Sequence, residues 1–354
     1  MNCKNLKDKL QDIHRIGIFM LGGIGNYLML TPMVHALKDL KPDFNIILIL
    51  SQSILKDVLK DEEYIYDTLS IEDYNRIRLI IELRKKRLDM TIASTGINPL
   101  KGSVLALLSG ARYRIGEDIK GMGLFYNYKQ SYRHDDHEVI GNLKLISPLE
   151  IGIDNNNTQL RFNLSQEDVR YAKSILGQAG VGNKDLVIGI HPGSEERLSF
   201  KRWSPEKFAE IADILSKQGK KIIFLGGVKE NPLIRDIMDH MHSDAIDLSG
   251  KLTLRETAAV IKRCDLFISN DTGLMHIAAA FDVPLVAIFG PTMFHKTGPY
   301  GKGIKRVVRK EISCSPCYDY KIRRCKFELE CLKSISVRDV LDAVEEVLRI
   351  NEKV

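Results

Sequence analysis

Short apolar segments alternate with amphipathic ones along most of this chain, and that alternation restricts the fold more than any other feature. The apolar segments form two groups, at 15–21, 44–50 and 90–94 and at 186–191, 221–227, 265–269 and 284–290. Between them, apolar residues recur at helical spacing. Strands that alternate with helices build parallel sheets, so we predict an α/β protein with two doubly wound units.

The chain is long enough for two domains, because 354 residues exceed the roughly 250–300 at which a single core stops growing. The segment 152–158, GIDNNNT, has the composition of a linker. It overlaps the end of an amphipathic stretch at 137–153 that we predict to be one long helix. We place a first domain at 1–160, a second at 161–335, and a C-terminal helix at 336–354 that packs back on the first domain.

Charge and hydropathy exclude several classes of protein. No apolar run approaches the roughly 18–20 residues that span a membrane, and the N-terminal segment lacks a signal-peptide core, so we expect a cytoplasmic protein. The net charge of +6 is concentrated in basic runs at 84–87, 302–310 and 321–326. These are either solvated surfaces or sites that attract phosphate, in a ligand or on an anionic membrane. Nucleic acid is not an expected partner, because no nucleic-acid-binding motif accompanies the charge.

Four of the six cysteines are close together in the sequence, in the pattern C-x2-C-x7-C-x5-C at Cys314, Cys317, Cys325 and Cys331. Four thiolates satisfy a tetrahedral zinc ion, but the second C-x2-C of a typical zinc motif is missing. Free thiols that pack a loop are the alternative, since disulfides are disfavoured in a reducing cytoplasm. Both interpretations stay open, and we assign no metal.

A glycine-rich loop, GGIGN at 22–26, follows the first apolar segment. A dinucleotide site has the pattern G-x-G-x-x-G and an acidic residue at the end of the second strand. Gly23 and Gly25 fit this pattern, but Leu28 replaces the third glycine, and the second strand ends in Ser51-Gln52. No P-loop motif, G-x4-G-K-[ST], occurs either. We therefore expect no dinucleotide and assign no cofactor.

The loop at 270–273 has the composition of an anion site. An apolar strand ends at Ser269, and a helix begins near Gly273. Free N–H groups and the helix dipole at such a start attract a diphosphate, to which Thr272 and His276 can donate hydrogen bonds. The alternative is that Asp271 is only an N-cap and that His276 lies on the surface or in the core.

Two further loops leave predicted strands and offer polar groups. In HPGSEERLSFKRW, Lys201 is placed to neutralise a phosphate, and Ser194 lies in the same loop. In GGVKENP, the carboxylate of Glu230 is able to accept hydrogen bonds from ribose hydroxyls. By position alone, a solvated loop residue is an equally good interpretation of each.

Taken together and in order, these segments resemble glycosyltransferase family 9, which includes the heptosyltransferases of lipopolysaccharide core synthesis. The resemblance covers nearly the whole chain and rests on GGIGNYLMLTP, HPGSEERLSFKRWSPEKF, SGKLTLRETA and NDTGLMHIAAAFDVPLVAIFGPT. It implies a GT-B fold, with two Rossmann-like domains facing across a cleft. It also implies an inverting, metal-independent transfer of heptose from ADP-heptose to a lipopolysaccharide-type acceptor. Such an acceptor is anchored at the cytoplasmic face of the inner membrane, where this protein would make peripheral contact.

Family roles carry over to residues whose motifs match. The donor's diphosphate and sugar would be held by Lys201, Asp271, Thr272, Gly273 and His276. The ribose and the adenine would meet Glu230 and Leu252, and the acceptor would lie against Gly23 and Gly25.

The family's catalytic base is an Asp in the first glycine-rich loop, and Asn26 occupies its position. A neutral amide does not accept a proton at neutral pH, so Asn26 would at most orient the acceptor hydroxyl. Glu117 and Asp118 are candidate replacements. The family's Asp-Pro after GPT is also replaced, by Met293-Phe294. Two alternatives follow: a family member with another nucleotide sugar or glycan acceptor, or a catalytically weak nucleotide-sugar-binding protein.

Overall fold

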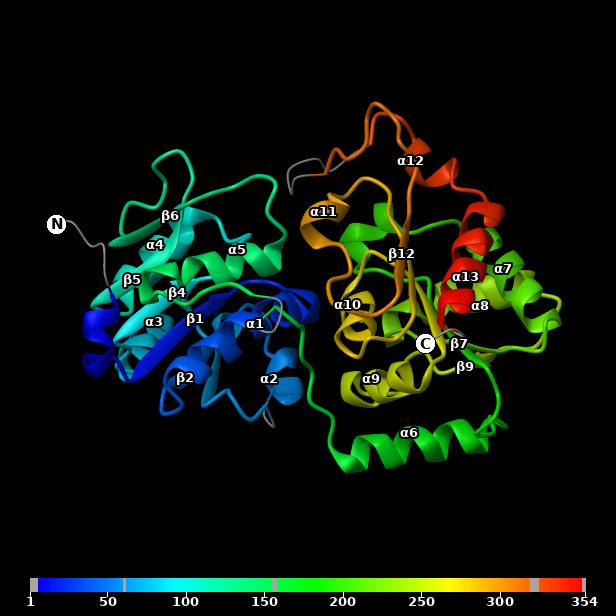
Figure 1. The fold of residues 1–354 in the computed structure, drawn as a ribbon, viewed down its shortest axis with the longest axis horizontal. Coiled ribbons are helices and arrows are strands. Elements are labelled where there is room, and N and C mark those ends of the chain that lie inside the picture. Colours follow the sequence, from blue (N-terminus) through cyan, green and yellow to red (C-terminus); the bar gives the residue numbers. More distant parts are fainter. Residues whose placement is uncertain (1–5, 60–61, 155–157, 319–324, 352–354) are drawn as a thin grey trace. The chain divides into compact units, whose positions relative to one another are not determined.

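The structure, a computed structural model, describes all residues except 1–5, 60–61, 155–157, 319–324 and 352–354. The chain divides into two compact units, Met1–Asn163 and Leu164–Val354, close to the predicted boundary at 160. The middle of the predicted linker lies outside the described residues. Each unit is a parallel sheet covered by helices (Figure 1).

The first unit contains one six-stranded sheet, in the order β3-β2-β1-β4-β5-β6. Its strands are β1 (Arg15–Met20), β2 (Asn45–Leu50), β3 (Asp67–Ser70), β4 (Met90–Ala93), β5 (Tyr113–Asp118) and β6 (Tyr128–Ser131). Its α-helices are α1 (Ile24–Leu40), α2 (Ile54–Leu59), α3 (Arg76–Lys85), α4 (Pro99–Leu108) and α5 (Glu138–Leu145), with 3-10 turns η1 (Lys7–Asp12), η2 (Ile71–Asp73) and η3 (Ser147–Leu149). All paired strands are parallel, as expected where helices connect them.

A proline inside α1 is accommodated by the residue before it. Pro32 has no N–H to donate to the carbonyl of Leu28, one turn earlier. The hydroxyl of Thr31 donates to that carbonyl instead, at 2.8 Å. The same hydroxyl oxygen accepts from the backbone N–H of Arg161, at 3.0 Å. The Thr-Pro pair therefore continues the helix and fixes the end of the first unit against it.

The long helix predicted over 137–153 is wrong in its second half. α5 ends at Leu145, and η3 follows over Ser147–Leu149. Pro148 contributes to the break, because it has no N–H to donate to the carbonyl of Lys144 in a continued α-helix.

The second unit repeats this design, with the sheet order β12-β11-β10-β7-β8-β9. Its strands are β7 (Val187–His191), β8 (Lys221–Phe224), β9 (Ile246–Asp247), β10 (Leu266–Asn270), β11 (Leu285–Ile288) and β12 (Lys305–Val308). Its α-helices are α6 (Gln166–Gln178), α7 (Pro205–Lys217), α8 (Asn231–His240), α9 (Leu254–Arg263), α10 (Gly273–Ala280), α11 (Phe294–Thr297), α12 (Glu330–Lys333) and α13 (Val337–Asn351), with 3-10 turns η4 (Glu196–Lys201) and η5 (Val228–Glu230).

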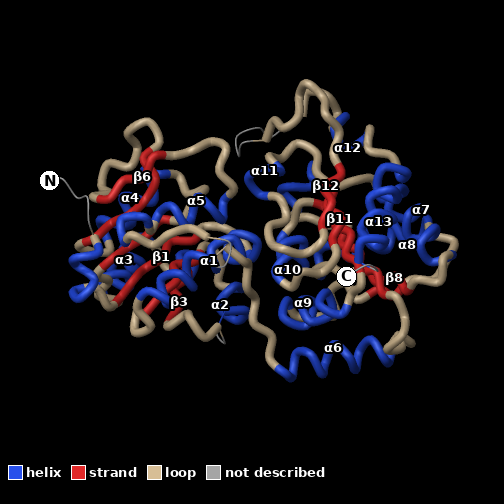
Figure 2. The backbone as a smooth tube through the Cα atoms, viewed as in Figure 1, coloured by secondary structure: helices blue, strands red, loops and turns tan. Residues whose placement is uncertain are grey.

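Helices cover both faces of this second sheet (Figure 2). Alternate strand residues such as Ile188 and Ile190 pack on one face with α7, α8 and α13, and α9 lies between α6 and α10. The sequence predicts that the C-terminal helix packs on the first domain. Its buried residues, among them Val340, Val344 and Val347, instead complete the core of the second unit, because α13 lies against α7, β11 and β12.

Both sheets have the strand order of a doubly wound Rossmann fold, 3-2-1-4-5-6 in each unit's own count, so the predicted pair of Rossmann-like units is confirmed. The winding reverses between β1 and β4 in the first unit and between β7 and β10 in the second. Ligands of such sheets bind at the carboxyl ends of the strands, at this switch point. These two edges are therefore where functional side chains are expected. In the described part of the chain, no helix is long and apolar enough to cross a membrane.

Candidate functional site

The switch point of the second unit brings two polar loops together. β7 ends at His191 and β10 at Asn270, and the paired residues Ser269 and His191 lie side by side in the ladder. The loop after β7 runs through η4 to Lys201, and the loop after β10 leads into α10. Residues predicted from separate motifs thus lie at one edge of the sheet.

Lys201 and Asp271 join these loops through an ion pair. The Lys201 Nζ lies 2.7 Å from Asp271 Oδ2, and the side chains are 14% and 7% exposed. The ammonium also lies 5.9 Å from the centre of the Tyr318 ring. A cation held this far from water interacts more strongly with a nearby anion than one on the surface. The alternative interpretation, that Lys201 is a solvated loop residue, is therefore wrong.

The start of α10 lies beside this ion pair. Thr272, not Asp271, is the N-cap residue, and its side chain makes no capping hydrogen bond. Gly273 is the first residue of the eight-residue helix, and His276 is its fourth, 3% exposed. The first-turn N–H groups of a helix have no partners within the helix and favour an anion. This corner therefore combines an ammonium group with a helix N-terminus.

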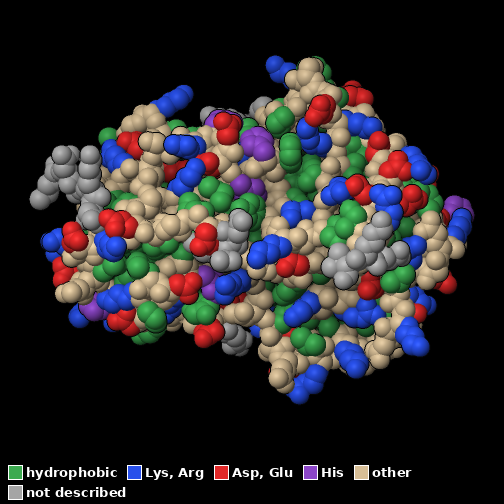
Figure 3. Space-filling model, in the orientation of Figure 1, with side chains coloured by type: hydrophobic (Ala, Val, Ile, Leu, Met, Phe, Trp, Pro, Cys, Tyr) green, Lys and Arg blue, Asp and Glu red, His purple; other side chains and the backbone are tan. Residues whose placement is uncertain are grey.

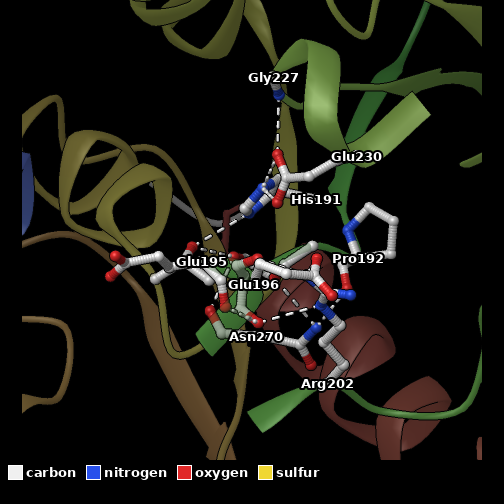
Figure 4. Close-up of polar contacts among 12 residues, drawn as sticks. His191, Pro192, Glu195, Glu196, Arg202, Gly227, Glu230 and Asn270 are labelled. Atoms are coloured by element: carbon white, nitrogen blue, oxygen red, sulfur yellow. Dashed lines mark hydrogen bonds and ion pairs between the residues drawn. The ribbon is translucent and has the colours of Figure 1, made fainter. Parts of the chain in front are cut away.

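His191 connects this corner to the third predicted loop. Its Nδ1 lies 3.1 Å from the hydroxyl of Thr272, and its Nε2 lies 3.2 and 3.3 Å from the two carboxylate oxygens of Glu230. The backbone N–H of Gly227 donates to Glu230 at 2.7 Å. Figure 4 shows the carboxylate between the imidazole ring and Gly227. His191 is 4% exposed and was not singled out in the sequence.

The environment of Glu230 favours its charged form. Burial by itself would raise its pKa, but His191, the Gly227 N–H and Arg202 outweigh burial, so the pKa of Glu230 is lowered. The carboxylate also lies directly over Gly193, where a Cβ would come within 1.7 Å of Glu230 Oε1. Gly193 of the His-Pro-Gly segment is therefore required for the carboxylate to occupy this place.

Asn270 fixes the loop after β7 to the end of β10. Its Oδ1 accepts from the backbone N–H of Trp203 at 3.1 Å, and its Nδ2 donates to the carbonyl of Pro192 at 2.7 Å. Ser194 is part of the same framework: its hydroxyl donates to the carbonyl of Leu198 at 3.0 Å and accepts from Arg202 at 3.1 Å. Ser194 is 5% exposed. Its predicted contact with a ligand would require these bonds to rearrange, whereas a role in shaping the loop needs none.

Leu252 lies further along the same edge, in the half-buried loop after β9. The next residue, Thr253, accepts from the Glu256 N–H, and Glu256 returns a bond to the Thr253 N–H, a capping box at the start of α9. Since β9 pairs with β8, Leu252 and Glu230 follow neighbouring strands.

The glycine-rich loop of the first unit forms the start of α1. Gly23 is the N-cap residue, and Gly25 and Asn26 lie in the first turn. Asn26 is exposed, and its side chain lies against Gly22, where a Cβ would come within 2.3 Å of Asn26 Oδ1. The predicted replacement Asp118 already accepts from the Gly123 N–H and from Lys129, at 2.9 and 3.0 Å.

The hydrogen bonds that Asp118 accepts make it a weaker base. They lower the pKa of Asp118, the Gly123 N–H most of all, and a weakly basic carboxylate is a poor proton acceptor at neutral pH. Glu117, the neighbouring carboxylate at the end of β5, is half-buried, as Asp118 is.

The four clustered cysteines are free thiols. Burial and the neighbouring thiols raise the pKa of Cys317, and they raise that of Cys331 to about 11. Within the described residues, no three of the four sulfur atoms lie within 4.8 Å of one another. As they stand, these thiols do not form a closed tetrahedral set.

The basic runs are largely paired within the protein. Partners are present for Arg84, Lys85, Lys86, Lys305, Arg306, Arg309 and Lys310. Most of the run at 321–326 lies outside the described residues. On the face drawn in Figure 3, basic and acidic side chains are interspersed. These runs therefore give little support to a phosphate-binding surface.

A family model described as glycosyltransferase family 9 (heptosyltransferase) matches residues 76–327, more than half of the chain. Lipooligosaccharide heptosyltransferase 2 of Campylobacter jejuni is 26% identical, over 95% of this chain and 98% of the relative. Lipopolysaccharide heptosyltransferase 3 of Escherichia coli is 26% identical, over 92% of this chain and 96% of the relative.

Solved structures share the fold. A glycosyl transferase family 9 protein from Veillonella parvula has a TM-score of 0.79 at 24% identity, covering 95% of this chain and 97% of its own. The Escherichia coli ADP-heptose lps heptosyltransferase II has a TM-score of 0.76 at 22% identity, covering 96% and 99%.

Proposed function

The chain belongs to glycosyltransferase family 9, and we propose that it transfers heptose from ADP-heptose to a lipopolysaccharide or lipooligosaccharide core acceptor. As a member of this family it is a glycosyltransferase. The choice of sugar and acceptor rests on relatives named as heptosyltransferases, which align over nearly their whole length.

One observation carries this proposal: the buried Lys201–Asp271 ion pair lies beside the start of α10, at the switch point of the second sheet. In the transfer, the nucleoside diphosphate is the leaving group, and negative charge grows on its phosphate oxygen as the bond to the sugar breaks. An ammonium group and free backbone N–H groups aimed at that charge stabilise the transition state more than the ground state. Lys201, Thr272 and Gly273 are therefore proposed to hold the diphosphate.

The rest of the donor follows along the same edge. Glu230 has its charge maintained by His191 and Gly227, and a carboxylate accepts from a pair of ribose hydroxyls. Leu252, on the next loop, is proposed to meet the adenine. His276 is proposed to reach the diphosphate or the sugar from the first turn of α10.

The acceptor is proposed to bind the first unit, against Gly23, Gly25 and Asn26. In an inverting transfer, its hydroxyl oxygen attacks the anomeric carbon from the face opposite ADP, and the bond from that carbon to the phosphate oxygen breaks. The hydroxyl proton passes to a base. An amide does not take that proton, so Asn26 is proposed to orient the hydroxyl and Glu117 to be tested as the base.

A second candidate function is a nucleotide-sugar-binding protein with little transferase activity. It is motivated by the exposed Asn26 at the position of the expected carboxylate. A different donor or glycan acceptor within the family is the other alternative, since Met293-Phe294 departs from the family pattern.

A cytoplasmic location with peripheral contact at the inner membrane is also a proposal. It is supported by the lipid anchor of the proposed acceptor, not by the basic runs at 84–87 and 302–310, whose described residues largely pair within the protein. Sedimentation with vesicles containing anionic lipid, with and without truncated lipopolysaccharide, tests it. Binding that needs the lipopolysaccharide supports contact through the acceptor.

The donor is tested by the thermal stability of purified protein with a panel of ADP-, UDP- and GDP-sugars. A ligand that binds only the folded state raises the unfolding temperature. We expect ADP-heptose to raise it and UDP- and GDP-sugars to have little effect. Stabilisation by UDP- or GDP-sugars without stabilisation by ADP-heptose would falsify the heptose assignment.

A further inference from the structure

The contacts of His191 point to a role that its place in the sequence does not reveal. It is the last residue of β7, at the switch point, and is 4% exposed. One ring nitrogen faces Glu230 and the other faces Thr272. Those two residues are proposed to meet opposite parts of the donor, the ribose and the diphosphate.

Glu230 decides which nitrogen of the neutral ring carries the proton. A carboxylate only accepts hydrogen bonds, and the Gly227 N–H and His191 keep the pKa of Glu230 low despite its burial. The Nε2 of His191 must therefore be the donor towards Glu230. In the neutral ring the Nδ1 then has no proton, and it accepts the hydroxyl hydrogen of Thr272 across 3.1 Å.

Protonation of the ring reverses the second of these bonds. Nδ1 then donates to the Thr272 oxygen, and the hydroxyl hydrogen of Thr272 is released. Among the described residues, the oxygen of Ser269 lies 3.2 Å from the Thr272 hydroxyl and is placed to accept that hydrogen. Ser269 is able to accept it, because its own hydroxyl donates to the carbonyl of Asn270 at 2.8 Å.

We propose that His191 is a positioning residue whose protonated form turns the Thr272 hydroxyl towards the donor's diphosphate while it holds Glu230 for the ribose. The inference rests on the proposed donor site. Among the charged and titratable groups, Glu230 faces the ring directly, and Arg202 acts on it through Glu230. The Lys201–Asp271 pair lies beside Thr272, and His276 lies in the first turn of α10. A diphosphate adds negative charge next to the ring, so donor binding and protonation of His191 favour each other.

The test is the affinity for ADP-heptose, measured by calorimetry between about pH 5.5 and 8, where histidine changes charge. The diester phosphates of this ligand do not titrate in that range. For wild type we expect affinity to fall about tenfold as the pH rises, the loss of about one hydrogen bond to a charged group. His191→Gln keeps polar groups at the site but does not titrate, so its affinity should fall less with pH than that of wild type. The slope that remains belongs to His276, the other histidine proposed to reach the donor.

Two further variants separate this proposal from a structural role. Thr272→Val should lose affinity mainly at the acid end and show a shallower profile than wild type, because the hydroxyl that the protonated ring turns towards the diphosphate is missing. His240→Gln alters an exposed histidine of α8 and should keep the wild-type profile. A flat wild-type profile, or an unchanged slope in His191→Gln, overturns the proposal. If no ADP-sugar binds at any pH, the donor assignment fails, and with it the premise of this inference.

Discussion

Lys201 and Asp271 come from loops 70 residues apart in the sequence and meet in an almost fully buried ion pair, with 2.7 Å between Nζ and Oδ2. Taking two charges out of water costs several kcal/mol, which the attraction between them does not always recover. An ammonium group placed this way beside a helix N-terminus is suited to a ligand that brings further negative charge.

Replacement of Lys201 by alanine should lower turnover by on the order of 100-fold, the usual cost of removing one group that stabilises a developing anion. The measurement is ADP release from ADP-heptose in the presence of acceptor. Lys217→Ala is the matched control, since Lys217 is an exposed residue of the neighbouring helix α7. Equal activity in the two variants would contradict the assignment of Lys201.

Replacement of Asp271 by asparagine removes the partner of a buried ammonium group. We expect a loss of about 1–3 kcal/mol in the free energy of unfolding, because the positive charge of Lys201 then lies away from water without a negatively charged partner. ADP should restore part of that loss, since a phosphate provides the missing negative charge. Urea denaturation with and without ADP checks both parts. If ADP raises the free energy of unfolding equally in wild type and variant, no phosphate lies near Lys201.

Asn26→Asp introduces a carboxylate at the position where the family has its base. If the acceptor hydroxyl lies there, turnover should rise, by up to on the order of 100-fold where proton transfer limits the rate. Asn26→Ala is the control, and its turnover should not rise. Glu117→Gln should abolish activity of the wild type only if Glu117 is the base. Wild-type activity untouched by all three substitutions would place the acceptor elsewhere.

The Thr31–Pro32 pair gives a prediction about stability alone. Thr31→Val leaves the carbonyl of Leu28 without its donor and should cost about 1–2 kcal/mol of unfolding free energy. Pro32→Ala restores a backbone N–H to the same carbonyl, so Thr31→Val should cost less in that background. The lost bond from the Arg161 N–H is common to both backgrounds and cancels. Additive effects of the two substitutions would mean that the Thr31 hydroxyl does not replace the missing N–H.

Sequence reasoning located the strands of both switch points, because each is a short apolar run before a polar or glycine-rich loop. It placed Lys201, Thr272 and Glu230 in loops but not their mutual contacts, which depend on the neighbours of each strand. Parallel order within a sheet is set by long-range packing, and no local pattern specifies it. The observed order explains why the three loops share one edge.

Several residues were missed for a related reason. His191 and Asn270 end buried strands, where one polar residue resembles the start of any loop. Only their buried hydrogen bonds distinguish them. The useful signal is positional: a polar residue that closes an apolar strand just before a Pro-Gly or Asp-Thr-Gly segment. The helix α6 was missed too, although Ser165 and Asp168 form a capping box at its start.

The most direct test of the account is whether purified wild-type protein transfers heptose to a truncated lipopolysaccharide acceptor. The product is followed by mass spectrometry and the released ADP by a coupled assay. We expect acceptor-dependent release of ADP, a mass increase of one heptose, and loss of both in Lys201→Ala. Tight binding of ADP-heptose without transfer to any core acceptor would contradict it and favour a nucleotide-sugar-binding protein.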